Sequence, residues 1–495
     1  MKGGANEEQP ETIPRRAWII LGILGSVGLV TTYGETMIIP AIPDLINEFD
    51  ISYSLSSWIL TSYLIAGAVM TPIAGKLSDI YGRKRVLLVL MIIYTIGLSF
   101  GGLSSNFTIL IIARVIQGIG ISMFSIAFSM ILDEFPKGRL ATAQGIIAAV
   151  FSGGAVVGLA VGGSIIEAFD WRATFLSVVP LSIIIIIIIS KLIHDRISIP
   201  IEARTVTKST DGISKSYNGI DLKGALALTS TITSFLLAIT FLESVKQSLH
   251  LIIFLSIISL VSLFSFILIE KKSLSPLIDL KLLKDKIILP ANILLMCLGC
   301  TLFMTYQTIA IMIKSPTPFG FGGNSIDIIQ VQLPFMMILF LVAIISGFLI
   351  SKLGNVRPTI IGSIISSIGF FSLFLYHASE LSIAIYLVII AVGLSFTEVG
   401  AFNISTLFVP KQFSGISIGI TTLLFLVGMS IGPAISGMFM EQYRFIADDV
   451  VSSYPSGEAY DLIFLTGALI SIVSVALTLV VTRRVSISNS IFIER

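Results

Sequence analysis

Cysteine, histidine and charged side chains are scarce in this sequence. Its 495 residues include only 2 Cys and 3 His, and 12% of them are charged. Two cysteines build neither a disulfide framework nor a four-ligand zinc site, and we interpret Cys297 and Cys300 as packing residues on one helix face. The histidines form no HExxH pair, and a Gly-x-x-x-x-Gly-Lys-Ser/Thr phosphate loop is absent. We therefore expect no metal site and no direct coupling to nucleotide hydrolysis on this chain.

Long apolar runs dominate the sequence instead. Hydrophobic residues make up 55% of it and the mean hydropathy is +0.99, which is typical of a polytopic membrane protein. Apolar runs of about 18 or more residues predict fourteen membrane-spanning helices. These cover residues 17–41, 54–76, 86–104, 107–132, 139–165, 172–193, 221–243, 249–269, 287–313, 326–352, 357–376, 380–409, 414–440 and 461–482. The predicted fold class is an all-α integral membrane protein.

The distribution of Lys and Arg predicts the orientation of the spans. A short loop at residues 75–85, between two charge-free runs, contains Lys76 and the run Arg83-Lys84-Arg85. The positive-inside rule places this loop in the cytosol. With an even number of spans and a polar N-terminal tail inside, few of the 31 Lys and Arg residues lie on the opposite face: Arg172, Lys246, Lys314 and Arg444. We expect a multi-pass protein of the plasma (cell) membrane with both termini in the cytosol.

Two sequence patterns occur twice. The pattern Gly75-x-Leu77-x-Asp79-x-x-Gly82 reappears as Gly347-x-Leu349-x-Ser351-x-x-Gly354. A glycine ladder at Gly145, Gly154, Gly158, Gly162 and Gly163 reappears as Gly419, Gly428, Gly432, Ser436 and Gly437. These repeats predict two six-helix bundles with two further helices inserted between them. The predicted organisation is a cytosolic N-terminal tail at 1–16, a first bundle at 17–193, a cytosolic linker with the inserted helices at 194–286, a second bundle at 287–482 and a cytosolic C-terminal tail at 483–495.

The first pattern resembles a known family. Read in full, G-x-L-x-D-x-x-G-R-K-R resembles the loop between helices 2 and 3 of the major facilitator superfamily, secondary transporters that work by alternating access. A basic loop that only fixes topology would explain the cations but not Asp79 between Gly75 and Gly82. We expect these three residues and Arg83 to form a conformational gate, in which Asp79 contacts the N-terminal end of the helix predicted from residue 414 in the outward-facing state.

Asp133, at the end of the span predicted over 107–132, is the remaining candidate for this gate. It either closes a charge network with Arg83 or is a solvated loop acid.

The glycine ladder is a second point of resemblance. Its spacing places small residues along one helix face and permits close contact with a neighbouring helix. It resembles the antiporter motif of the same superfamily, which ends in Gly-Pro-x-x-Gly-Gly. Here Leu159 stands in place of the proline, whereas the copy in the second half has the proline, as Gly432-Pro433. The small-residue face is therefore present, but the expected kink is missing.

One arginine lies inside a predicted span. Arg114 and Gln117 belong to Ala113-Arg114-Val115-Ile116-Gln117-Gly118, which resembles the R-x-x-Q-G motif of the superfamily. Because a buried arginine is costly in a bilayer, it should face the bundle interior and have a partner there. Two interpretations stand: a fixed arginine that holds the first bundle together, or a residue of proton relay or substrate recognition.

Two acids, Glu35 and Glu398, also fall well inside apolar spans. Intramembrane acids point to function by default, although either could be a structural hydrogen-bonding group. Glu35 precedes a segment similar to the end of helix 1 in drug exporters, where the family acid often lies one residue earlier, at the position of Gly34. We expect Glu35 to carry the transported proton, because removal from water favours a neutral carboxyl and a nearby cation favours the charged form. Glu398 would be a second acid whose role depends on the substrate.

Aromatic and polar residues near these positions are candidate walls of a substrate cavity. They are Tyr33, Trp58, Tyr63, Phe124, Tyr306, Gln307 and Asn403.

Together, the spans and motifs resemble the fourteen-helix drug:proton antiporter branch of the superfamily. The resemblance implies the major facilitator fold and export of a hydrophobic or cationic small molecule, driven by a proton gradient without a cofactor. The partners would be substrate, protons and the lipid bilayer, with no nucleic acid, and the protein would be a monomer. A facilitative or proton-coupled transporter of another organic solute on the same fold is an alternative. A membrane-embedded enzyme or receptor is disfavoured by the missing His cluster and by the internal repeat.

Overall fold

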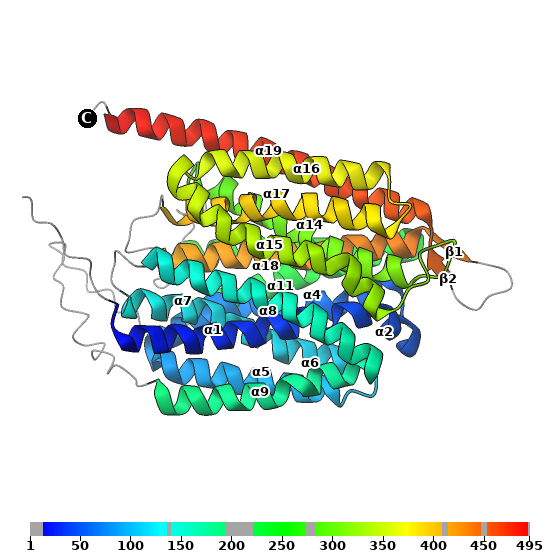
Figure 1. Ribbon diagram of the computed structural model, residues 1–495, viewed down its shortest axis with the longest axis horizontal. Helices are drawn as coiled ribbons and strands as arrows, with labels where there is room; N and C mark the ends of the chain where they lie inside the picture. Colours follow the sequence, from blue (N-terminus) through cyan, green and yellow to red (C-terminus); the bar gives the residue numbers. More distant parts are fainter. Residues whose placement is uncertain are drawn as a thin grey trace, which may run out of the picture.

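The computed structural model describes residues 13–135, 140–193, 221–273, 284–407, 414–446 and 453–493. Within these ranges it contains fourteen helices long and apolar enough to cross a membrane, which confirms the predicted number. The helices lie side by side in one elongated bundle (Figure 1). The first residues of α1 (Arg15–Thr36) and the C-terminus lie at one end of the bundle, which we call the terminal end. α2 (Ile42–Phe49) lies at the opposite end, which we call the distal end.

The first half of the bundle ends with α9. After α1 come η1 (Ile39–Ala41), α2, α3 (Tyr53–Ser56), α4 (Trp58–Tyr81), α5 (Arg83–Gly102), α6 (Phe107–Ile119), η2 (Gly120–Ser122), α7 (Met123–Glu134), α8 (Leu140–Ala168) and α9 (Trp171–Leu192). The break at η1 coincides with Pro40 and Pro43, which have no backbone N–H to continue a helix ladder. At η2, a Cβ on Gly120 would lie 2.7 Å from Cβ of Tyr94, so only glycine lets α5 approach so closely here.

The inserted pair and the second half follow. The pair consists of α11 (Leu222–Thr240), η4 (Phe241–Ser244) and α12 (Val245–Lys272). The second half consists of α14 (Ile288–Lys314), α15 (Ser325–Leu353), α16 (Val356–Leu375), α17 (Glu380–Leu407), α18 (Ser414–Gln442) and α19 (Gly457–Ile493). At the distal end, β1 (Arg444–Ile446) pairs antiparallel with β2 (Ser453–Pro455). α19 continues through most of the segment predicted as a tail at 483–495, while the polar stretch 194–220 lies outside the described residues.

The glycine ladder packs α8 directly onto α1. A Cβ added to Gly154 or Gly158 would lie 2.6 Å from a backbone atom of α1, and one added to Gly162 would lie 2.6 Å from the backbone of Met37, the residue after α1. The hydroxyls of Thr32 and Thr36 donate to backbone carbonyls of α8, each at 2.9 Å. Small residues thus allow interhelical hydrogen bonds that side chains would otherwise prevent.

The second half repeats this packing with α18 on α14. A Cβ added to Gly428 or Gly432 would overlap a backbone carbonyl oxygen of α14. The last glycine of each ladder faces the other half instead: Gly163 faces Ile329 of α15, and Gly437 faces the backbone of α3. The surroundings of Gly145, the first member of the ladder, lie outside the described residues.

Replacing Gly158 by Ala is expected to lower the free energy of unfolding by about 1–3 kcal/mol, because the new methyl group forces α8 away from α1. Gly153 on the same helix supplies the matched control, since its added Cβ would meet only Phe340, at 3.8 Å. Thermal unfolding in detergent should therefore show a lower midpoint for Gly158→Ala than for Gly153→Ala. Equal midpoints would contradict close packing at the ladder.

The two halves are bonded to each other at the distal end. Lys314 pairs with Asp44 at 2.6 Å, and the backbone N–H of Tyr53 donates to Glu441 at 3.0 Å. We call these four residues the distal latch. At the terminal end, a Cβ added to Gly75, Gly347 or Gly419 would meet no atom within 4 Å, which indicates open space. The structure is therefore closed at the distal end.

Reversing the charge of Asp44 should open the distal end. Asp44→Lys replaces the attraction to Lys314 by a repulsion that solvent partly screens. We therefore expect the fraction of molecules open at the distal end to rise about fivefold. Ser56, buried at the seam, reports the opening when it is replaced by Cys in a protein with Cys297 and Cys300 changed to Ala. A membrane-impermeant maleimide added at the distal face should label it faster.

The double variant Asp44→Lys, Lys314→Asp restores opposite charges and should return labelling to the slow rate. Slow labelling in the single variant would mean that this ion pair does not hold the distal end closed.

Candidate functional site

Arg114, on α6, is fully buried, and its Nε and Nη1 are hydrogen-bonded, whereas its Nη2 has no hydrogen-bond partner among the described residues. Its Nε donates to the carbonyl of Ile59 at 2.8 Å, and its Nη1 donates to Gln117 Oε1 at 2.8 Å and to the carbonyl of Gly34 at 3.3 Å. The guanidinium lies over the ring of Tyr63, 4.2 Å from its centroid, where a cation is attracted to the aromatic face. Dipoles and a ring therefore hold this charge inside the first half.

Gly34 leaves no room for a larger side chain. A Cβ there would overlap the hydroxyl of Tyr94 and lie 3.1 Å from Gln117 Nε2. The Tyr94 hydroxyl is fixed, because it donates to the carbonyl of Val30 at 3.0 Å. The acid on α1 is the next residue, Glu35. Tyr94 is not among the predicted site residues, since a single tyrosine in an apolar span gives no functional signal.

The two intramembrane acids come from different halves and lie within electrostatic range of the same tyrosine. Glu35, on α1, is 7% exposed, whereas Glu398, on α17, is half-buried. Both interact electrostatically with the hydroxyl of Tyr306 on α14. Glu35 also interacts with Arg114, yet the structure has no ion pair between these two described residues. The cation is therefore near the acid without being locked to it.

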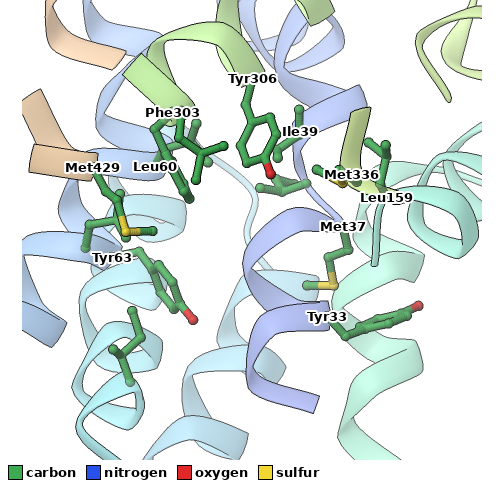
Figure 2. Close-up of a cluster of buried hydrophobic side chains, with 14 of the residues drawn as sticks. Tyr33, Met37, Ile39, Leu60, Tyr63, Leu159, Phe303, Tyr306, Met336 and Met429 are labelled. Atoms are coloured by element: carbon green, nitrogen blue, oxygen red, sulfur yellow. The ribbon is translucent and has the colours of Figure 1, made fainter. Parts of the chain in front are cut away.

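An apolar cluster closes the space between the halves near these acids (Figure 2). It includes Tyr33, Met37, Ile39, Leu60, Tyr63 and Leu159 from the first half, and Phe303, Tyr306, Met336 and Met429 from the second. Edge contacts with Phe303 and Phe335 hold the ring of Tyr306, at centroid distances of 5.3 and 5.7 Å. Leu159, which stands where the family motif has proline, is fully buried in this cluster. It supplies apolar packing that a proline ring would not reproduce.

Two of the predicted wall residues lie at the seam between the halves. Tyr306 is in the apolar cluster, and Gln307 donates to Ser56 across the seam at 3.5 Å. Gln332, which sequence analysis missed, donates to the carbonyl of Tyr306 at 2.9 Å. The Oε1 atoms of Gln307 and Gln332 are buried and accept no hydrogen bond from the described residues. These amides offer acceptor groups close to Tyr306.

The other predicted wall residues contact neighbouring helices. The ring of Tyr63 lies beneath the guanidinium of Arg114, and the hydroxyl of Tyr33 lies 3.4 Å from the hydroxyl of Ser177. The indole N–H of Trp58 donates to the hydroxyl of Thr240 at 3.0 Å. The ring of Phe124 packs on the ring of Phe151 with centroids 4.0 Å apart, and Asn403 is half-buried on α17. Trp58 is thus turned toward the inserted pair.

The predicted gate lies at the terminal end, between α4 and α5. Gly82 has a φ of 92° and its repeat partner Gly354 a φ of 77°, both in the region that favours glycine. Arg83 follows Gly82 and donates from Nη1 to the carbonyl of Ser129 on α7. The loop is therefore bonded to the first half.

Other parts of the gate are not described. The side chains of Asp79 and Asp133, and the surroundings of Ser414 at the start of α18, lie outside the described residues. The contacts expected of the two acids stay predictions.

Comparison with known proteins decides the family. The model of the Major Facilitator Superfamily matches residues 24–433. This chain belongs to that superfamily. It is 26% identical over 413 residues to the multidrug transporter protein MdtP of Bacillus subtilis (strain 168), covering 82% of this chain and 71% of that protein. It is 25% identical over 426 residues to multidrug resistance protein 3 of the same organism, covering 85% and 78%.

A solved structure shows the same fold. The crystal structure of the human organic anion transporter MFSD10 (TETRAN) superposes with a TM-score of 0.64 at 12% identity, covering 95% of this chain and 100% of that one. The predicted family and major facilitator fold are confirmed. The chain is a multi-pass membrane transporter and not an enzyme.

Proposed function

We propose that this transporter exports hydrophobic or cationic compounds in exchange for protons, by alternating access, with its terminal end in the cytosol. The observation that carries the proposal is a pair of intramembrane acids, Glu35 and Glu398, one in each half and both within electrostatic range of Tyr306. A carboxyl group away from water favours its neutral form, and a nearby cation favours the charged form. Proton and cationic substrate can therefore compete for one acid.

The surroundings of the acids fit such an exchange. Arg114 is near Glu35 but bonded elsewhere, so the acid is free to change its charge. The apolar cluster and the amide oxygens of Gln307 and Gln332 would contact an amphipathic ligand with a hydrogen-bond donor. Two relatives named as multidrug proteins support the same substrate class.

Transport into everted membrane vesicles tests the proposal. Ethidium and a panel of cationic and neutral dyes should accumulate when a proton gradient is imposed, and a protonophore should abolish the accumulation. Vesicles without the protein give the background. Uptake that is unchanged by the protonophore would indicate a facilitator instead. The absence of uptake for every dye would exclude this substrate class.

Glu398→Gln is expected to impair cationic dyes more than neutral ones. The substitution keeps the size of the half-buried side chain and removes the charge that would attract a cation. Rates for one cationic and one neutral dye, measured in the same vesicles, give the comparison. An equal loss for both would assign Glu398 a structural role.

A further inference from the structure

The inserted pair lies over the seam between the two halves. α11 packs into a buried apolar cluster that also contains residues of α4 and α18. Ile232 of α11 shares this cluster with Ile65 of α4 and Ile420 of α18. One helix of the pair thus touches both halves where they meet.

At the distal end, hydrogen bonds join α11 to the first half. The indole Nε1 of Trp58 donates to the hydroxyl of Thr240 at 3.0 Å. The hydroxyl of Ser54 donates to the carbonyl of the same residue at 3.1 Å, in a buried position. Both donors belong to α3 and α4, so the end of α11 is fixed to the first half.

At the terminal end, charges join the pair to the same half. Lys76, near the end of α4, interacts electrostatically with Asp221 and Glu270. These two acids flank the start of α11, since a Cβ added to Gly224 would lie 3.0 Å from Cγ of Asp221 and 3.1 Å from Oε1 of Glu270. Glu270 is only 4% exposed, and a buried carboxylate needs a cation nearby. Lys76 is a cation of the first half that interacts with this carboxylate.

The described contacts of α11 with α18 have a different chemistry. They involve apolar side chains, among them Ile420, Leu423 and Ala434. Apolar contacts have no preferred direction, whereas hydrogen bonds and ion pairs hold one geometry. α11 and η4 pack closely on α18, and α11 also packs on α4, but the described hydrogen bonds and charge interactions of the pair are with the first half.

We propose that the inserted pair moves with the first half as one body and slides over α18, so that it keeps the seam between α4 and α18 covered from lipid as the halves move. This inference concerns the mechanics of the fold and does not depend on which compound is transported.

Two engineered disulfides test the proposal. In a protein with Cys297→Ala and Cys300→Ala, one variant carries Ile232→Cys with Ile65→Cys, and the other carries Ile232→Cys with Val427→Cys, whose native side chain packs against the same cluster. The first disulfide joins α11 to α4 and the second joins it to α18. Each is formed by oxidation and removed by a reductant, so every sample is its own control.

Two readouts are used. One is ethidium efflux, and the other is maleimide labelling of Ser56→Cys from the distal face, which needs no substrate. The α4 disulfide should leave both within about twofold of the reduced sample, and the α18 disulfide should lower both about tenfold or more. Block by the α4 disulfide, or free movement with the α18 disulfide, would overturn the proposal. If the protein does not transport ethidium, the labelling readout alone tests this inference. Failure of the proposed function is therefore distinguished from failure of the inference.

A charge swap tests the anchor even where a disulfide does not form. Lys76→Glu alone places three acids at the start of α11, and their repulsion should break the attachment of the pair to the first half. Labelling of the Ser56→Cys reporter should then slow by severalfold. Lys76→Glu with Glu270→Lys should restore the rate. No recovery, or no effect of the single change, would overturn the assignment of Lys76 as the anchor.

Discussion

Glu35→Gln is expected to reduce proton-driven accumulation of substrate to the level of vesicles that lack the protein. Glutamine keeps the shape and the hydrogen-bonding oxygen of the side chain, but it cannot take up or release a proton. Glu35 is 7% exposed and interacts electrostatically with Arg114 of the first half and Tyr306 of the second. A change in its charge therefore acts on both halves. Downhill exchange or ligand binding should partly persist, since the apolar cluster and the amides of Gln307 and Gln332 are unchanged.

The measurement is ethidium uptake by everted vesicles with and without a proton gradient, corrected for the amount of folded protein. Glu48→Gln is the matched control, because that acid pairs with Arg172 at 2.6 Å near the distal surface. It should transport almost normally. If Glu35→Gln accumulates ethidium as well as the unmodified protein does, Glu35 is not the coupling residue. Glu398 and Asp79 would then be the next candidates.

The spans, the repeat and the glycine ladder could be predicted from the sequence because each follows from a local rule. A run of apolar residues must form a helix in a bilayer, and small residues four apart must lie on one face. A Cβ on Gly154 or Gly158 would indeed lie 2.6 Å from the backbone of α1, and a Cβ on Gly162 would lie 2.6 Å from the backbone of Met37, directly after α1. The repeated φ values of Gly82 and Gly354 likewise follow a repeated sequence pattern.

The details of the site could not be predicted because they depend on contacts between distant segments. Tyr94 fills the space beside Gly34 only because α5 crosses α1 at that height. Leu159 breaks a family motif in the sequence, and only the fold shows that it packs between the halves. Trp58, predicted to line a cavity, faces α11, since a linear pattern does not say which side of α4 an inserted helix covers.

Arg114→Lys is expected to lower transport about tenfold or more, although the charge is kept. The planar guanidinium bonds in two directions at once, to Ile59 and to Gln117, and stacks on Tyr63. A lysine ammonium cannot reproduce this fork, so at least one buried carbonyl loses its donor. Leaving a buried polar group unpaired costs about 1–3 kcal/mol, and 1.4 kcal/mol corresponds to a factor of ten in an equilibrium.

Arg172→Lys provides the control for Arg114→Lys. Arg172 forms ion pairs with Glu48 and Asp170, but all three side chains are at least 30% exposed, so solvent can replace lost contacts. Transport should fall little in this variant. Thermal unfolding of both proteins separates two roles that the sequence leaves open. If Arg114→Lys loses transport in proportion to folded protein, Arg114 only holds the first half together; if folded protein stays normal and transport per molecule falls, Arg114 acts on the charge state of Glu35.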